Sequence, residues 1–338
     1  MKASKLIFIL HFIFTCSIPV FSQTPRIALV KPNGATTIHS TILAAYDAAS
    51  DDDCIYLPGG TFDNSLSLNK RIHIYGAGYN IDSCQTTGIT VIGQILINNN
   101  AANGSIQGIK INYLSFENEG DGFHIKRCLI NNGIQFNTNL VWNNIIIENN
   151  FIKGYSANQG YSYISLNGQV TNSVFKNNVI LGNINGGDGL LFKNNLFFYQ
   201  GLYPMNLASN STYNNNIYVG GSISVNNSIF NNNVNLSGSE GANNQNYNLI
   251  YEPFPEIFEN SGLPPYFPYD VHNDYHVKSS SACKNSGTDG TDRGIYGGTS
   301  PWVEGSVPSN PHIYFKQVAE ETNASGQLQI HFKVRTGN

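Results

Sequence analysis

One six-residue pattern recurs through the middle of the chain. The stretch IIENNF at residues 146–151 returns as VFKNNV at 174–179, LFKNNL at 191–196 and IFNNNV at 229–234, with looser copies CLINNG at 128–133 and TYNNNI at 212–217. The second Asn of these copies recurs at a mean spacing of about 20 residues, a period typical of solenoid repeats. Each copy is too short to bury its own apolar residues, so neighbouring copies must stack. The repeat therefore predicts an all-β solenoid.

The Asn pair in each copy predicts two structural roles. Asn tolerates the left-handed backbone that a sharp turn needs, and stacked Asn amides hydrogen-bond along a column. The residues that directly precede the Asn pair are predicted to form a second, outward column, with about 4.8 Å between neighbouring strands. In three of the copies they are Glu148, Lys176 and Lys193. Stacked lysines repel unless an anion lies between them, and Glu148 or an anionic sugar suits that place. A solvent-facing row of salt bridges is the alternative.

Composition narrows the class of protein. The chain has 338 residues, of which 41% are hydrophobic, 12% aromatic and only 12% charged, and this aromatic content excludes intrinsic disorder. Its formal net charge is −4 and it has no basic tail, which argues against a nucleic-acid partner. No CxxC motif or Cys/His cluster supports zinc. We expect a monomer without a cofactor. Calcium is the one metal for which the sequence offers candidate ligands, which are given below.

The N-terminal part predicts an exported protein. Residues 1–22 read as a secretory signal peptide, with Lys2 and Lys5 before an apolar run, and no other run is long enough to span a membrane. We therefore expect a secreted protein, extracellular or at the cell surface. In the N-terminal segment 23–53, apolar spacing predicts an amphipathic helix from Thr37 to Ser50 that covers the open end of the solenoid.

The remaining boundaries follow from composition. The solenoid is expected over residues 54–298, a Pro/Gly/Ser-rich linker over 299–311, and a β-hairpin segment over 312–338 with a turn at 323–326. An exported chain permits a disulfide, for which Cys54 and Cys84 are the first candidates. Buried free thiols are the alternative.

Two segments near the ends of the repeat region resemble a known superfamily. The strings IYLPGGTF at 55–62 and LNKRIHIYGAGYN at 68–80 look like the opening of bacterial right-handed parallel β-helix proteins of the pectate-lyase-like superfamily. The segment from DYHV at 274–277 to GTDGTDRGIYGG at 287–298 resembles their closing coil. The resemblance implies a right-handed parallel β-helix, and it leaves the activity open because this fold hosts lyases, hydrolases and adhesins.

The catalytic motifs of such enzymes are not recognisable in the chain. The nearest polar constellation lies in GDGFHIKRC at 120–128, where Asp121, His124, Lys126 and Arg127 are candidates for acid/base chemistry. Strand alternation places His124 and Lys126 on one outer face. Solvated surface is the alternative interpretation. Asp289 and Asp292 are candidates for calcium, although GTDG is equally a turn sequence.

Tyrosines supply candidate sugar-binding residues. The stretch GYSANQGYSY at 154–163 reads as a loop that carries Tyr155, Tyr161 and Tyr163, and Tyr199 and Tyr203 are expected on the same side. Aromatic rings pack against the C–H faces of sugars. With Lys176 and Lys193, these tyrosines predict an exported protein that binds a polysaccharide or cell-surface glycan along one face. A divergent polysaccharide lyase or glycoside hydrolase, or a structural adhesin, are the alternatives.

Overall fold

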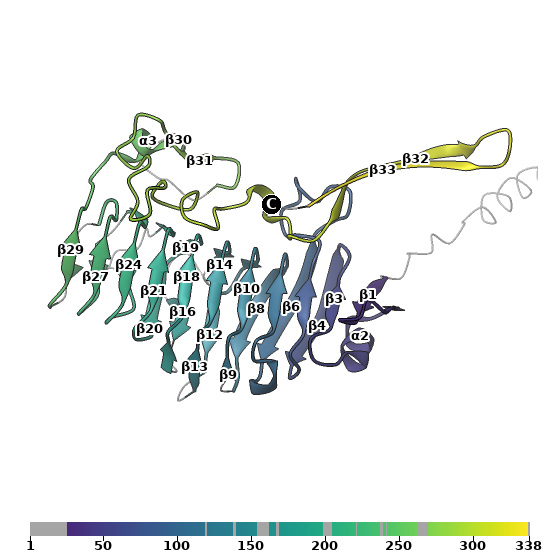
Figure 1. Cartoon of the computed structure of the whole chain (residues 1–338), viewed down its shortest axis with the longest axis horizontal. Helices are drawn as coiled ribbons and strands as arrows, with labels where there is room; N and C mark the ends of the chain where they lie inside the picture. The colour runs from purple at the N-terminus through teal and green to yellow at the C-terminus, as the bar shows by residue number, and fades with distance from the viewer. Residues whose placement is uncertain are drawn as a thin grey trace, which may run out of the picture.

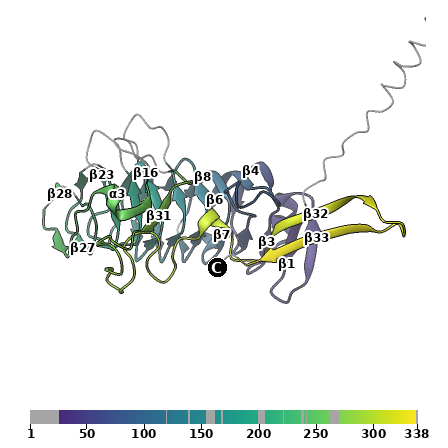
Figure 2. The same cartoon turned by 90° about the horizontal axis from the view of Figure 1, so that it is seen from above.

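The structure, a computed structural model, describes residues 26–336 apart from 119, 138–139, 154–161, 167–168, 199–204, 221, 237–238, 241 and 262–269. Short strands stack into a parallel β-solenoid, which confirms the all-β architecture predicted from the repeat (Figure 1). Seen from above, the strands succeed one another along a single axis (Figure 2). The predicted signal peptide lies outside the described residues.

One twelve-stranded sheet, here called the long sheet, runs the length of the solenoid. Its parallel strands are three residues each and align without slippage, so that Ile147, Phe175 and Phe192 form one column. In spatial order these strands are β3 (Cys54–Tyr56), β5 (His73–Tyr75), β7 (Ser105–Gln107), β10 (His124–Lys126), β14 (Ile146–Glu148), β18 (Val174–Lys176), β21 (Leu191–Lys193), β24 (Thr212–Asn214), β27 (Ile229–Asn231) and β29 (Gln245–Tyr247).

Further sheets close the turns of the solenoid. The eleven-stranded sheet contains β4 (Gly60–Leu68), β6 (Thr90–Ile97), β8 (Lys110–Phe116), β11 (Leu129–Ile130), β12 (Ile134–Phe136), β15 (Phe151–Ile152), β16 (Ser162–Leu166), β19 (Val179–Leu181), β20 (Asn183–Gly186), β22 (Leu196–Phe198) and β25 (Ile217–Val219). Two three-stranded sheets contain β9 (Gly120–Asp121), β13 (Val141–Asn143) and β17 (Gln169–Thr171), and β23 (Met205–Asn206), β26 (Ile223–Ser224) and β28 (Ser239–Glu240). A 3-10 turn, η1 (Asn99–Ala101), lies after β6.

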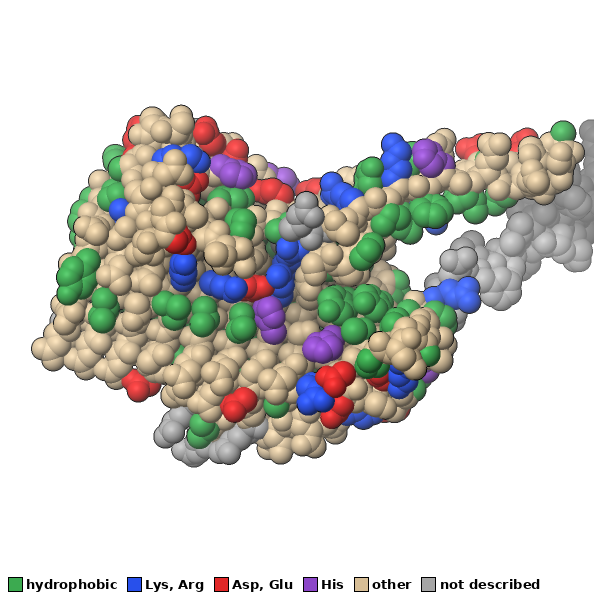
Figure 3. Space-filling view, in the orientation of Figure 1, with side chains coloured by type: hydrophobic (Ala, Val, Ile, Leu, Met, Phe, Trp, Pro, Cys, Tyr) green, Lys and Arg blue, Asp and Glu red, His purple; other side chains and the backbone are tan. Residues whose placement is uncertain are grey.

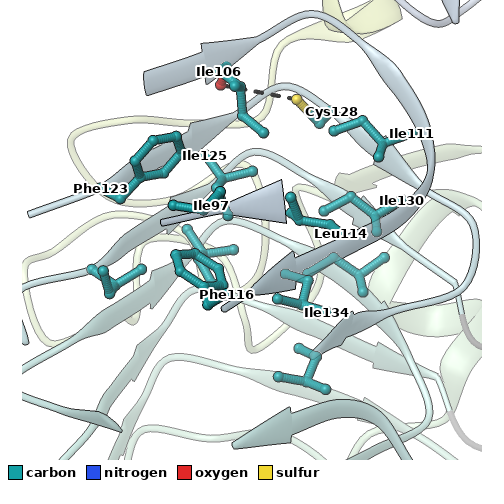
Figure 4. Packing of buried hydrophobic residues seen from close by; sticks show 14 of the residues in the cluster. Ile97, Ile106, Ile111, Leu114, Phe116, Phe123, Ile125, Cys128, Ile130 and Ile134 are labelled. Carbon is teal, nitrogen blue, oxygen red and sulfur yellow. Dashed lines mark hydrogen bonds between the residues drawn. The ribbon is translucent and has the colours of Figure 1, made fainter. Parts of the chain in front are cut away.

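The core fills the inside of the solenoid. The middle residue of each long-sheet strand from β3 to β27 points inward and is fully buried. The rings of Phe175, Phe192, Tyr213 and Phe230 stack at centroid spacings of 4.8, 4.7 and 4.7 Å, which is the spacing of the strands that carry them. Figure 4 shows another part of this core, where Ile and Leu side chains pack with Phe116 and Phe123 and side chains of facing sheets point toward one another.

The two Asn residues of each repeat have the two predicted roles. The first, at Asn149, Asn177, Asn194, Asn215 and Asn232, has a left-handed backbone, with φ between 52° and 58°. The second, at Asn150, Asn178, Asn195, Asn216 and Asn233, is fully buried. Each of these side-chain oxygens from Asn178 to Asn233 accepts from the side-chain amide and the backbone N–H of the Asn one turn before it, at 2.8–3.1 Å. The predicted amide column is confirmed.

The register predicted for the loose copy at 128–133 is wrong. Lys126 pairs with Glu148, so Arg127 and Cys128 occupy the places of the two Asn residues. Arg127 has the left-handed backbone, with φ 50°, and the backbone N–H of Cys128 donates to the Asn150 side chain at 2.8 Å. Asn132 is therefore not part of the column.

An antiparallel edge and a short helix cover the N-terminal end. β1 (Ile27–Val30) pairs antiparallel with β3 and with β2 (Thr36–His39). The helix α2 (Ile42–Ala48) is capped by Thr41 and buries Ile42, Ala45 and Tyr46 in the core. A helix at this end is confirmed, but its predicted start at Thr37 is wrong, because residues 36–39 are drawn into the sheet edge by β1.

The C-terminal part does not close the solenoid with a further coil. β31 (Asp274–Val277) pairs antiparallel with β30 (Phe258–Asn260), after the short helix α3 (Phe254–Ile257), so the closing coil expected there is wrong. Residues 286–309, here called the strap, run back along the solenoid and include η2 (Glu304–Ser306). The stretch 299–311, expected to be a linker, is instead attached to the solenoid at several points: Trp302 and Val307 are buried, although other residues of the stretch are exposed.

The chain ends in the predicted hairpin. β32 (His312–Thr322) and β33 (Leu328–Arg335) pair antiparallel around a turn at 323–327. Cys54 and Cys84, the candidate disulfide, are both free thiols. Cys54 lies at an outer position of the long sheet, whereas the buried thiol of Cys84 donates to the Ala77 carbonyl at 3.1 Å. None of the helices in the described part of the chain has the length and apolar character that crossing a bilayer requires.

Candidate functional site

The outer face of the long sheet carries two parallel rows of side chains. Each three-residue strand points its first and third residues outward, and the exact stacking turns these into columns. The third positions give the charged row: Lys126, Glu148, Lys176 and Lys193. The first positions give the apolar row: Ile146, Val174, Leu191 and Ile229, with Thr212 between the last two. Figure 3 shows both rows on the face toward the viewer.

Glu148 is the centre of the charged row. The residue is 2% exposed, and its carboxylate accepts from the Lys126 ammonium at 2.6 Å and from the Lys176 ammonium at 2.5 Å, one through each oxygen. The Nε2 atom of His124, on the same strand as Lys126, lies 3.2 Å from the Lys126-bound oxygen. The two lysines remain about a quarter exposed, so the acid is hidden while its cationic partners reach the surface.

The environment of Glu148 keeps this acid ionised. Burial alone raises the pKa of a carboxyl, but the hydrogen bonds from His124, Lys126 and Lys176 outweigh burial and hold the pKa of Glu148 well below its ordinary value. With both carboxylate oxygens held by cationic side chains, Glu148 is poorly suited to accept a proton in a reaction. It is well suited to hold two ammonium groups side by side on the face of the sheet.

The row continues toward the C-terminal end with a paired lysine. Lys193 contacts Asp289 of the strap at 2.8 Å, and this contact and the Thr291 hydroxyl help lower the pKa of Asp289 to about 2 against the opposing effect of burial. Asp292 contacts Lys284 at 2.8 Å instead. The two candidate calcium ligands are thus each neutralised by a different lysine. Among the residues that the structure describes, no group of three His, Cys, Asp or Glu side chains is placed to hold a metal.

The strap forms a wall along the charged row. Its carbonyls accept from the side chains of the left-handed residues, in antiparallel order: Ser286 from Asn232, Gly294 from Asn194, Ile295 and Gly297 from Asn177, Ser300 from Asn149, and Val307 from Arg127. The Ser300 hydroxyl also lies 3.4 Å from the Lys176 ammonium. The left-handed residues therefore turn the chain and also fix the border of the site.

An aromatic pair extends the charged row toward the N-terminal end. Tyr56 and Tyr75 hold the third positions of β3 and β5, and their rings stack at 5.0 Å with an interplanar angle of 13°. Gln107 lies between Tyr75 and Lys126 in the same column. The sequence reasoning missed this pair, although both tyrosines occupy the repeat position of Glu148.

The structure separates two predicted site residues from the others. Asp121 lies on β9, in a different sheet, and accepts from the backbone and side chain of Asn143 at 3.0 Å. Arg127 is buried beneath the strap. His124 and Lys126 do lie together on the outer face, as predicted, with Glu148 in the place expected for Asp121.

The predicted tyrosine strip lies almost wholly outside the described residues. Tyr155, Tyr161, Tyr199 and Tyr203 are not described, and Tyr163 is described only in its backbone, within β16. Sugar binding by these side chains stays a prediction from the sequence.

Comparisons with known proteins show no family for this chain. No protein-family model matches the chain, and no curated protein matches it. Among solved structures it is similar to one described as the crystal structure of pectate lyase Pel9A, with a TM-score of 0.43 and 12% sequence identity over 79% of this chain and 89% of that one. At this level of likeness, what the chain does has to be argued from its own residues.

Proposed function

We propose that this chain is an exported protein that binds an acidic polysaccharide along the outer face of the long sheet. The observation that carries the proposal is the pair of surface lysines, Lys126 and Lys176, held on one buried carboxylate, Glu148. A buried carboxylate that holds two lysines at the surface favours binding of a second anion, because the ammonium groups are already fixed in position.

The charge balance of the row favours an anionic ligand. Three lysines face two carboxylates, Glu148 and Asp289, on a chain whose formal net charge is −4. This local excess of positive charge attracts carboxylate or sulfate groups of a glycan and repels other cations. The attraction acts at close range and is screened by salt.

The shape of the face suits an extended chain of sugars. From the Tyr56–Tyr75 pair to Lys193 the third-position column makes six strand-to-strand steps, about 29 Å at about 4.8 Å a step. The stacked tyrosines offer a flat surface for the apolar face of a sugar ring, and the apolar row lies alongside the lysines. The strap bounds one side and leaves the face open along its length.

A binding experiment with matched variants tests the proposal. Affinity for acidic and neutral polysaccharides is measured by isothermal titration calorimetry for the unaltered protein, for Lys126→Ala/Lys176→Ala and for the control Lys278→Ala/Lys284→Ala, whose lysines lie off the face. We expect acidic chains alone to bind, a loss of at least tenfold in the first variant, and none in the control. Affinity should also rise with oligosaccharide length up to about 29 Å. Equal affinity in the two variants would refute the proposal.

One observation favours a second candidate, a polysaccharide lyase. His124 lies beside Lys126 on the outer face, and an imidazole is a group suited to remove the proton α to a carboxylate. The same acidic polysaccharides are incubated with the protein, with and without calcium, and unsaturated chain ends are followed by ultraviolet absorbance. Product formation that disappears in His124→Ala would make the chain a lyase, whereas binding without product supports the first proposal. A structural adhesin would show neither.

A further inference from the structure

A cavity lies outside the long sheet, just past the turns that follow β10 and β14. It has a volume of about 200 Å³ and opens where the next strands, β11 and β15, begin. Leu129 and Phe151 are the paired first residues of these strands and line the cavity together with Tyr79. All three are buried in an apolar cluster that lies outside the solenoid core. The cavity therefore has a buried apolar and aromatic base.

Two segments far apart in the chain complete the cavity. Residues 79–82 line one part of it, and residues 271–272 line another. Each segment adds an exposed apolar side chain, Ile81 from the first and Val271 from the second. The segments meet at the rim, where the Nε2 atom of His272 lies 3.6 Å from the Asp82 carboxylate. The apolar lining thus continues from the base to the solvent.

Lys153 brings a positive charge into this lining. It lies two residues after Phe151, and its ammonium is 4.8 Å from the centroid of the Phe151 ring. Among the described residues no carboxylate forms an ion pair with Lys153, and its charged neighbour is another lysine, Lys110. Burial and the repulsion from Lys110 lower the pKa of Lys153. A bound anion would relieve that repulsion.

The acids near the rim contact a different partner. Asp270 and Asp82 lie 2.8 and 3.6 Å from the two ring nitrogens of His272, and these contacts raise the pKa of that imidazole. The side chains of Asp82 and His272 are more than half exposed, so solvent and salt screen their charges. Lys153 is only partly exposed and is screened less. The lining therefore favours an anion at Lys153.

Size, lining and charge together define a ligand. Sites for drug-sized molecules have about 300–1,000 Å³, so this smaller cavity suits a molecule of one ring. Five of the nine lining residues are apolar or aromatic, and hydroxyl groups of a sugar would be left against them without partners.

We propose that the cavity binds a small aromatic carboxylate, with its carboxylate at Lys153 and its ring against Phe151 and Leu129. The ring gains contacts with the aromatic lining, and the carboxylate gains a charge-assisted hydrogen bond from the ammonium. The cavity lies apart from the charged row, so this inference does not depend on the proposed function.

Fluorine NMR of 4-fluorophenylacetate titrated with the full chain measures binding. Its amide, 4-fluorophenylacetamide, keeps the ring without the charge, and fluoroacetate keeps the charge without the ring. We expect the aromatic carboxylate to bind at least tenfold more tightly than either. No binding of 4-fluorophenylacetate, or an affinity equal to that of the amide or of fluoroacetate, would overturn the proposal.

A lysine variant and a matched control locate the bound carboxylate. Lys153→Met keeps an unbranched apolar side chain beside Phe151 but removes the ammonium. It should lower the affinity for 4-fluorophenylacetate at least tenfold and leave the affinity for the amide unchanged. The control Lys126→Ala/Lys176→Ala removes two lysines of the charged row and should change neither affinity. Binding that survives Lys153→Met and is lost in the control would place the carboxylate on the charged row and refute the proposal.

A pair of variants at the exposed wall tests the site without disturbing the fold. Ile81 is 59% exposed, so Ile81→Asp and Ile81→Lys remove the same apolar side chain and should both keep the melting temperature of the unaltered protein. The introduced Asp repels a carboxylate in the cavity and the introduced Lys attracts it. Affinity for 4-fluorophenylacetate should therefore be about fivefold lower in Ile81→Asp than in Ile81→Lys. Equal affinity in the two variants would show that the carboxylate binds elsewhere.

Discussion

Replacement of the buried Asn178 by Ala should destabilise the solenoid far more than replacement of an Asn on its outer face. Asn178 lies in the middle of the amide column and is fully buried. Its side-chain oxygen accepts from the backbone N–H and the side-chain amide of Asn150, at 2.9 and 3.1 Å. Its own amide donates to the Ile147 carbonyl at 2.8 Å and to the Asn195 side chain at 3.0 Å.

The magnitude follows from these four hydrogen bonds. Each contributes about 1 kcal/mol net, and the buried N–H of Asn150 loses its side-chain acceptor, so the free energy of unfolding should fall by about 4 kcal/mol. Whole domains are stable by only about 5–15 kcal/mol. A matched control is Asn214→Ala in the outward column, where the side chain is partly exposed and accepts one hydrogen bond, from Asn231 at 2.9 Å. That loss should cost less than about 1 kcal/mol.

Urea unfolding followed by circular dichroism measures both variants. We expect a much lower unfolding midpoint for Asn178→Ala, and native-state amide exchange should be fastest in the strands that flank it, β14, β18 and β21. If Asn178→Ala unfolds at the same urea concentration as Asn214→Ala, the buried column does not stabilise the solenoid as argued.

Three further predictions concern the site, the strap and the thiols. Glu148→Gln should lower the free energy of unfolding by about 2 kcal/mol above pH 5. Because the native pKa of Glu148 is depressed, this difference in stability is complete above the ordinary carboxyl pKa of about 4.3 and should shrink as the pH falls below it. A difference that grows in acid would contradict the ion cluster around Glu148. Asn177→Gly keeps the left-handed turn but removes the amide that holds the strap, so amide exchange should rise in residues 295–300 while β18 stays protected, and uniform protection would contradict this role. Burial raises the pKa of Cys84 to about 11 and of Cys283 to about 12, so alkylation of these thiols at pH 8 should be slow in the native protein. A reducing agent should leave the melting temperature unchanged. Rapid labelling would show that these thiols are accessible.

Sequence reasoning predicts the solenoid and its amide column because the signal is local and repeated. Where it fails, the cause lies outside that repeated pattern. The segment at Thr36–His39 has helical spacing but pairs with β1, and the register slip at 128–133 arises because Arg127 takes a turn position that Asn holds elsewhere. Residues 299–309 of the strap look like a linker because the carbonyls by which they are held, at Ser300 and Val307, have no signature in the sequence.

The candidate site could be predicted in part for the same reasons. The repeat register places Glu148, Lys176 and Lys193 in one column, and the structure has that column. Glu148 lies between Lys126 and Lys176, not between Lys176 and Lys193, and Lys193 contacts Asp289 of the strap instead. Asp121 was wrongly grouped with His124 because Gly122, with φ 69°, turns the chain between two sheets. The Tyr56–Tyr75 pair was within reach of the register argument, since both residues follow an inward Ile.

The most direct measurement for the central claim is a crystal structure of the protein with an acidic oligosaccharide long enough to cover the column. We predict that its carboxylate or sulfate groups contact the ammonium groups of Lys126 and Lys176, and that a sugar ring lies against Tyr75, with Glu148 still beneath the two lysines. An oligosaccharide bound on another surface, with this face of the long sheet empty, would contradict the account.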